Sequence, residues 1–166
     1  MSALPPLIRP LDPSADLAAV EALYQAAAAF WQMTDRRPPN RQKAEAFFVD
    51  TPPGCDPAAS HRLGLFEHYD LTGVAEMAFG FPNSNSAYLG LMVLAPSARE
   101  RGLGRAFLHH LETLARAKAC PELFLAVLEE NQAGRGFWKA QGFAPTGLSR
   151  HDAETGHTLH RLVKPL

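Results

Sequence analysis

The part of the sequence best suited to chemistry is a turn rich in glycine and arginine that follows the apolar run Leu89–Leu94. Gly102 and Gly104 open a helical pattern, and three arginines stand beside them: Arg99, Arg101 and Arg105. Backbone N–H groups at the start of a helix have no partners within the helix, so they bind anions and above all phosphate. Glycine lets a phosphate approach the backbone closely, and arginine adds positive charge. The turn therefore predicts a phosphate-binding site, with an ordinary helix start as the alternative.

Two widespread phosphate motifs do not fit this turn. The dinucleotide-binding pattern G-x-G-x-x-G requires a third glycine where Phe107 stands, and it places its first glycine directly after the strand. The P-loop pattern G-x-x-x-x-G-K-(S/T) does not occur in the sequence. These mismatches argue against NAD and against nucleoside triphosphates as ligands.

The turn resembles the pyrophosphate-binding motif of the GNAT acyltransferases, in which (Q/R)-x-x-G-x-(G/A) follows an apolar strand. Here the motif reads Leu94-x-Pro96-x-x-Arg99-x-x-Gly102-x-Gly104. Three short runs further along the chain resemble the next motif of the same family: Asn131-x-Ala133, Phe137-Trp138-Lys139 and Gly142-Phe143. The resemblance covers nearly the whole chain and implies an acetyl-CoA-dependent N-acetyltransferase, with residues 1–166 as a single domain.

The resemblance also implies how acetyl-CoA would be held. Backbone groups of Met92, Val93 and Leu94 would pair with the pantetheine arm, and one N–H would face the thioester oxygen as an oxyanion site. The pyrophosphate would be held by backbone N–H groups of the turn: Arg99, Glu100, Arg101, Gly102, Leu103, Gly104 and Arg105. Asn131 would reach the pantetheine, and Phe137 and Trp138 would pack near the sulfur.

The reaction implied by the resemblance is direct attack of an amine on the thioester, which calls for a base and an acid. Many family members carry a tyrosine where Trp138 stands, and an indole N–H lacks the acidity to replace it. Glu76 is the best candidate base, because burial on its apolar strand would raise its pKa. A carboxylate on a solvated strand face is the alternative. Tyr88 is a second candidate.

The acceptor pocket of this family is usually built from the first helix, the loop after it and the middle strands. Trp31 would form an aromatic wall, and Asp35 would hold a cationic amine. The alternatives are core packing for Trp31 and a helix end or turn for Asp35. The acceptor would be a small amine or a peptide. No histidine spacing predicts a metal site.

The surrounding pattern predicts a mixed α/β domain. Helices are expected over residues 13–31, 41–49, 104–119 and 131–141. Strands are expected over residues 7–11, 62–69, 72–81, 87–94, 122–128, 143–149 and 157–163. Short links predict an antiparallel meander for the middle three strands, and the dense apolar run 122–128 predicts a buried parallel pair. With the resemblance, this implies a GNAT-like fold with a mixed, twisted and splayed sheet flanked by helices.

Bulk composition excludes some partners. Lys and Arg number 16 and Asp and Glu 17, for a net charge of -1, so no global basic field would hold nucleic acid or an anionic membrane. The two cysteines form neither a disulfide framework nor a zinc pattern. Residues 1–10 lack a secretory pattern, and no apolar run reaches membrane-spanning length. A cytoplasmic protein is expected.

Two other functions stay open at this point. A non-catalytic acyl-CoA-binding module would explain the lack of an evident acid and base. A small-anion or nucleotide-binding domain would explain the glycine turn, but it would leave the stretch 131–143 without a role. A homodimer through the C-terminal strands is compatible with the sequence, whereas the acceptor and the acyl length do not follow from it.

Overall fold

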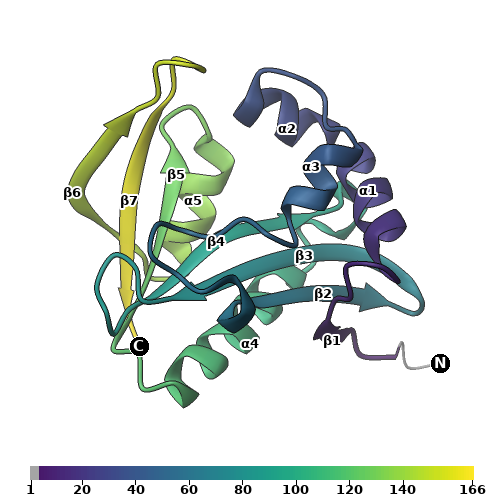
Figure 1. Ribbon diagram of the computed structural model, residues 1–166, viewed down its shortest axis with the longest axis horizontal. Helices are drawn as coiled ribbons and strands as arrows, with labels where there is room; N and C mark the ends of the chain where they lie inside the picture. The colour runs from purple at the N-terminus through teal and green to yellow at the C-terminus, as the bar shows by residue number, and fades with distance from the viewer. Residues whose placement is uncertain (1–3) are drawn as a thin grey trace.

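A seven-stranded mixed sheet forms the centre of the protein in the computed structural model, which describes residues 4–166 (Figure 1). Residues 1–3 of the predicted domain lie outside the described residues. The strands are β1 Leu7–Pro10, β2 His61–Glu67, β3 Asp70–Phe79, β4 Ala87–Leu94, β5 Glu122–Leu128, β6 Ala144–His151 and β7 Thr158–Pro165. Their order across the sheet is β1-β2-β3-β4-β5-β7-β6. The predicted single-domain α/β fold with a mixed sheet is confirmed.

Strand pairing follows the predicted pattern. β2, β3 and β4 form the antiparallel meander, and β4 pairs with β5 in parallel. The parallel pairing is short, since it joins Ala87–Leu89 to Leu123–Leu125 and goes no further. Beyond Leu89 the two strands diverge, while β5 continues against β7 along its whole length (Figure 1). The sheet is therefore splayed between β4 and β5.

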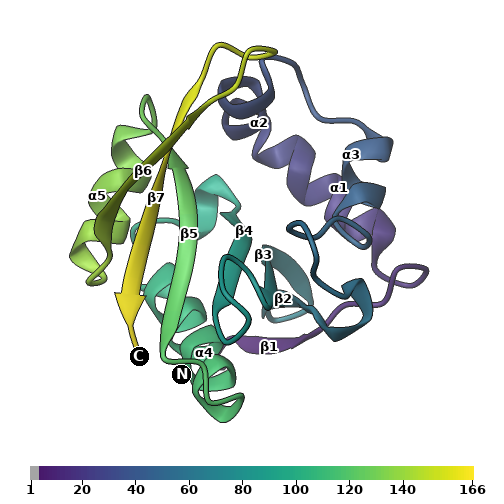
Figure 2. The same cartoon turned by 60° about the vertical axis from the view of Figure 1, so that its left-hand side comes forward.

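Helices cover the sheet in two groups. They are α1 Leu17–Ala26, α2 Ala28–Asp35, α3 Arg41–Ala46, α4 Leu103–Ala117 and α5 Gln132–Ala140, with short 3-10 helices η1 at Pro57–Ala59 and η2 at Pro96–Ala98. Figure 2 shows α1 to α3 on one side of the sheet and α4 with α5 on the other. The splay between β4 and β5 thus has a different group of helices on each side.

The predicted single helix over residues 13–31 is wrong. Asp12 instead organises a turn, because its Oδ1 accepts from the N–H groups of Ser14 and Ala15, and the helix begins only at Leu17. The helix then breaks at Ala27, whose φ of -96° and ψ of 26° are not helical. The break turns α2 so that Trp31 packs on Tyr24 of α1 with ring centroids 4.5 Å apart.

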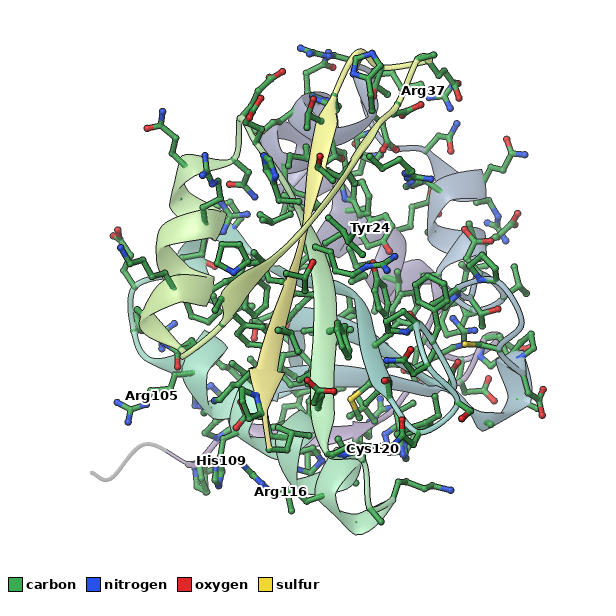
Figure 3. The ribbon with its side chains drawn as sticks, turned by 90° about the vertical axis from the view of Figure 1, so that its left-hand side faces the viewer. Tyr24, Arg37, Arg105, His109, Arg116 and Cys120 are labelled. Carbon is green, nitrogen blue, oxygen red and sulfur yellow. The ribbon has the colours of Figure 1, made fainter. Side chains whose placement is uncertain are left out.

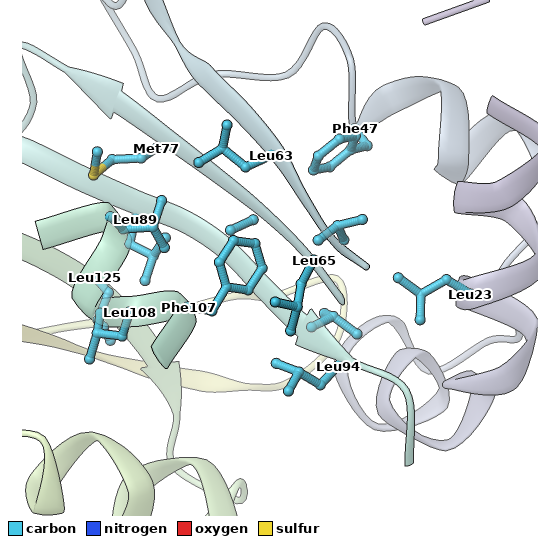
Figure 4. Close-up of a cluster of buried hydrophobic side chains, with 14 of the residues drawn as sticks. Leu23, Phe47, Leu63, Leu65, Met77, Leu89, Leu94, Phe107, Leu108 and Leu125 are labelled. Atoms are coloured by element: carbon cyan, nitrogen blue, oxygen red, sulfur yellow. The ribbon is translucent and has the colours of Figure 1, made fainter. Parts of the chain in front are cut away.

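The core joins the middle strands to α1 and α4, as the buried side chains in Figure 4 show. Phe107 and Leu111 of α4 face the sheet, as their spacing predicts. Glu112, although charged, is also a buried residue of α4. Its side chain is buried, with the residue only 4% exposed, and it pairs with Lys164 of β7 and, at 3.8 Å, with Arg116. Lys164 supplies the counter-charge that makes this burial tolerable.

Candidate active site

The glycine turn leads directly into α4. Gly102 precedes the helix with a φ of 79°, a left-handed conformation that glycine adopts without steric cost. Among the described residues no side chain caps this helix end, and its first turn contains no acidic residue. Gly104 lies against α5, since a Cβ added there would be 3.3 Å from the Phe137 ring. The first N–H groups of α4 are thus left for an anion.

Two of the three arginines in the turn are held by the protein itself. Arg101 donates both guanidinium nitrogens to the Glu67 carboxylate of β2, at 2.6 and 3.1 Å. The Nε of Arg99 donates to the backbone oxygen of Leu94 at 3.1 Å. Arg105 makes no ion pair within residues 4–166, and its side chain points away from α4 (Figure 3). The first two side chains therefore anchor the turn to β2 and β4.

β4 presents an open backbone edge beside this turn. Leu91 to Leu94 pair with β3 on one side, Gly90 falls at a register shift without a β3 partner, and the described pairing with β5 stops at Leu89. This edge contains Met92, Val93 and Leu94. An extended ligand arm could therefore hydrogen-bond to it as an added strand.

A cavity of about 720 Å³ lies at the splay, on the side of α1 to α3. Its walls come from those three helices, the loop after α3, the middle strands and the β6–β7 hairpin. Three of the predicted site residues line it together: Trp31, Glu76 and Tyr88. A volume of this size suits a small ligand.

Glu76 is the buried acid of this cavity. Its side chain comes from β3, and the residue is only 5% exposed, so the solvated-face alternative is wrong. Within residues 4–166 its Oε1 has no hydrogen-bond partner. Burial raises the pKa of Glu76 to about 7, against a smaller lowering by the nearby Arg62 guanidinium. A carboxyl group with this pKa can exchange a proton near neutral pH.

Tyr88 and Trp31 contribute the aromatic surface of the cavity. Burial raises the pKa of the Tyr88 phenol, so it keeps its proton at neutral pH and is a poor base. Trp31 is buried against Tyr24, and the Lys43 ammonium lies 4.8 Å from its ring centroid. Asp35 lies outside the cavity lining and pairs with Lys43 at 2.8 Å. Its carboxylate is thus already engaged by a cation of the protein.

The second sequence motif forms the start of α5 and its packing. The Asn131 side-chain oxygen accepts from the N–H of Gly134 at 2.9 Å and caps the helix. Trp138 packs between Phe137 and Phe143, with ring centroids 4.9 and 5.4 Å away. It lies outside the cavity that holds Glu76. The geometry gives Asn131 a capping role and Trp138 a packing role.

Comparison with known proteins gives the family. The model of the acetyltransferase (GNAT) family matches residues 20–143, which is most of the chain. The chain belongs to the GNAT acetyltransferase family. Among proteins with curated descriptions, none matches this sequence.

Solved GNAT structures share the fold at low identity. An acetyltransferase from Thermus thermophilus superposes with a TM-score of 0.79 at 22% identity over 100% of both chains. The ribosomal-protein-S18-alanine N-acetyltransferase of Escherichia coli gives 0.71 at 18% identity, covering 97% of this chain and 94% of its own. The PaiA N-acetyltransferase of Thermoplasma acidophilum, solved in complex with coenzyme A, gives 0.72 at 18% identity, covering 98% and 100%.

Sequence reasoning missed part of this GNAT site. Arg150 and Arg161 line the cavity from the β6–β7 hairpin, and no local pattern marks them. Gly90 also lines it, and a glycine inside an apolar strand was a readable signal of a bulge or a close approach. In residues 4–166 no group of His, Cys, Asp or Glu side chains could hold a metal ion, and no helix is long and apolar enough to cross a membrane.

Proposed function

We propose that this GNAT protein transfers an acetyl group from acetyl-CoA to a primary amine bound in the Glu76 cavity. The observation that carries the proposal is a buried carboxyl group with a pKa of about 7 at the point where β4 and β5 separate. Such a carboxyl group would serve as a proton acceptor beside the open edge of β4. A cytoplasmic location is part of the proposal, and a homodimer stays a prediction.

The residues present fit acyl-CoA. The open β4 edge from Gly90 to Leu94 suits the pantetheine arm, and the uncapped start of α4 suits the pyrophosphate. Gly104 keeps that helix start clear of a side chain where α4 meets Phe137. The Thermoplasma relative is named as a complex with coenzyme A, which supports the same cofactor here. When bound, acetyl-CoA supplies the acetyl group as an activated thioester.

Glu76 would remove the proton that the amine must lose. An amine in water is protonated at neutral pH, so it becomes a nucleophile only after it loses a proton. The Glu76 carboxylate can take this proton directly or through one water molecule, because a base with a pKa near the working pH is the most effective. The nearby Arg62 charge opposes the rise in pKa and so keeps part of the carboxylate ionised.

Tyr88 would act as a proton donor at the same site. The phenol keeps its proton at neutral pH, and it lines the cavity from β4, the strand that presents the open edge. Trp138 stands where many family members carry a tyrosine, but it packs against Phe137 and Phe143. Tyr88 is therefore the better candidate for protonating the leaving sulfur.

The test is free-CoA release from acetyl-CoA in the presence of an amine panel that includes small amines and short peptides. Peptides belong in the panel because the Escherichia coli relative is named for a protein alanine. The wild type should release CoA with at least one amine, and Glu76→Gln should lose most of the rate while binding acetyl-CoA normally. Tight acetyl-CoA binding with no turnover of any amine would instead favour a non-catalytic acyl-CoA-binding module.

A further inference from the structure

The charges around the Glu76 cavity are separated between two walls. Glu76 of β3 and Asp50 of the loop after α3 are carboxylates on one side. Arg150 of β6 and Arg161 of β7 are guanidinium groups on the hairpin side. The cavity is therefore acidic on one wall and basic on the other.

The two arginines differ from Lys43 and Arg62 nearby because, within residues 4–166, no protein oxygen accepts a hydrogen bond from their guanidinium groups. Lys43 is paired with Asp35 at 2.8 Å, and Arg62 donates to the backbone oxygens of Phe47 and Asp50. Within residues 4–166 neither Arg150 nor Arg161 makes an ion pair or a side-chain hydrogen bond. Two guanidinium groups on one cavity wall thus keep their donors for a ligand.

Arg161 is held in place by aromatic contacts. Its guanidinium carbon lies 5.0 Å from the centroid of the Phe81 ring. Phe81 in turn meets the Tyr88 ring edge to face at 5.0 Å. Tyr88 lines the same cavity, and burial raises the pKa of its phenol, with Arg161 and Arg150 opposing the rise and Glu76 adding to it. Stacking on an aromatic face orients the guanidinium and leaves its edge available for an anion.

We propose that the acceptor is a small zwitterion, an amine that also carries a carboxylate or a similar anionic group. Arg161 and Arg150 bind the anionic group, and the amine points toward Glu76. The inference rests on the proposed function, because it assigns an orientation to the amine that Glu76 deprotonates. A planar guanidinium and a carboxylate match in geometry, so the pair selects such acceptors over plain alkylamines.

Contacts between α2 and the β6–β7 hairpin join two of the elements that line the cavity. Arg36 at the end of α2 pairs with Glu130 at 3.1 Å and donates to the backbone oxygen of Thr155 at 3.2 Å. The ring nitrogen Nε2 of His157 lies 2.7 Å from the backbone oxygen of Met33. These contacts join α2 to the turn of the β6–β7 hairpin, as Figure 2 shows. A bridge between two of the elements that line the cavity favours a small acceptor over a peptide.

The phosphates of acyl-CoA would bind away from Arg150 and Arg161. The start of α4 belongs to the other side of the sheet, together with α5 (Figure 2). Within residues 4–166 neither of these two helices contributes to the lining of the cavity. The acceptor is therefore the better source of the anion that would meet Arg161.

The experiment compares matched amines that differ only in the acid group. Rates of CoA release are measured with 3-aminopropanoate, 4-aminobutanoate and 5-aminopentanoate against propylamine, butylamine and pentylamine. The proteins are wild type, Arg161→Met, Arg161→Lys and Arg116→Met. Arg116 is an exposed arginine of α4, far from the cavity, and serves as the control for loss of a guanidinium (Figure 3).

We expect at least one aminoalkanoate to exceed its alkylamine partner by about tenfold or more in kcat/KM, as for one charge-assisted contact. Arg161→Met should lower kcat/KM for the aminoalkanoate about tenfold more than for its alkylamine partner, and so remove this preference. Arg161→Lys should keep part of it, and Arg116→Met should keep all of it. Equal rates for both members of every pair, or faster turnover of an amidated tripeptide, would overturn the inference and leave the proposed function intact.

A binding readout separates the two proposals when turnover is absent. Calorimetry compares 4-acetamidobutanoate with N-butylacetamide, the acetylated products, on the wild-type protein in the presence of CoA. Stronger binding of the acid, lost in Arg161→Met, supports the arginine wall even if no amine is acetylated. If neither product discriminates between wild type and Arg161→Met, the wall does not recognise an anion and the inference is wrong.

Discussion

The Glu76 carboxylate occupies the space that a side chain at position 90 would need, because a Cβ on Gly90 would overlap its Oε2 atom. The two residues meet at an irregularity between β3 and β4. Glu76 pairs with Leu91 and Met77 pairs with Leu89, so Gly90 is the extra residue of a β-bulge. The bulge and the missing side chain together make room for a buried acid beside the splay.

Gly90→Ala should therefore displace Glu76. We expect a loss of about 1–3 kcal/mol in the free energy of unfolding, as for overpacking, and at least a tenfold drop in kcat with little change in acetyl-CoA affinity. In a double-mutant cycle, Gly90→Ala is combined with Glu76→Ala, which removes the carboxylate that the new Cβ would meet. The double variant should be more stable than the sum of the two single changes predicts, by a coupling free energy of about 0.5–3 kcal/mol. Chemical denaturation of all four proteins measures this.

The matched control for the Gly90→Ala substitution is Gly136→Ala on α5. A Cβ at Gly136 meets no atom within 4 Å, and alanine is favoured over glycine inside a helix by about 1 kcal/mol. This variant should be at least as stable as the wild type and fully active. A Gly90→Ala protein that behaved like the control would show that Glu76 does not need this space.

The pH dependence of turnover should report the ionisation of Glu76. Because burial raises the pKa of Glu76 to about 7, kcat for the bound amine should rise with pH and level off above this value. Glu76→Gln should reduce kcat by about 10²–10⁴-fold and remove this limb of the profile. A profile with the same limb in Glu76→Gln would assign the titration to another group.

The contribution of Glu76 to the free energy of unfolding should fall as pH rises, whereas kcat should rise. Unfolded, Glu76 ionises near pH 4.5, whereas in the folded protein it keeps its proton up to about pH 7. Between these values the unfolded chain releases the proton first, so this group's contribution to stability falls as pH rises and is constant above about pH 7. The shift corresponds to about 3 kcal/mol.

Comparison with Glu76→Gln isolates that contribution. The pKa of Asp16 is lowered by its hydrogen bond to Arg9, and this group contributes stability that is lost only in more acidic solution. Both proteins share the Asp16 contribution, so it cancels when they are compared. The unfolding free energy of the wild type minus that of Glu76→Gln should therefore fall as pH rises from about 4.5 to 7 and stay constant outside this range. A constant difference across this range would contradict a raised pKa for Glu76.

Local patterns predicted the features that depend on neighbouring residues. The turn before α4 and the bounds of most strands follow from glycine placement and hydrophobic period, whereas the sequence left the burial of Glu76 open against a solvated strand face. Gly142 ends α5 with a φ of 95°, as expected of a helix stop. These features need no knowledge of the rest of the chain.

Features set by distant segments could not be predicted. The break between α1 and α2 falls in the alanine run 26–29, which contains neither glycine nor proline, and it is fixed by Trp31 packing on Tyr24. Glu112 is buried because Lys164 of β7 meets it across the fold. Arg161 reaches the cavity only because β7 lies beside β5 in the sheet. Each depends on the order of strands or on packing between helices rather than on a local motif.

The phosphate-binding role of the glycine turn is tested by a charge reversal at its entrance. The wild type should bind acetyl-CoA with a Kd of order 1–100 μM, or about -8 to -5.5 kcal/mol. Gly104→Glu should weaken binding by about 100-fold or more, because a carboxylate would repel the pyrophosphate at the start of α4. Gly104→Ala should lose less, since its Cβ carries no charge and meets only the side chains of Phe137 and Leu94.

His109→Glu completes this test, because it adds a negative charge to the exposed face of the same helix more than a turn away from the glycines (Figure 3). Calorimetric titration with acetyl-CoA should give this variant nearly the wild-type Kd at about 0.15 M ionic strength, where exposed charges are screened beyond about 8 Å. If His109→Glu loses binding as strongly as Gly104→Glu, the effect is long-range repulsion rather than a block at the turn. If Gly104→Glu binds normally, the pyrophosphate lies elsewhere and the turn is an ordinary helix start.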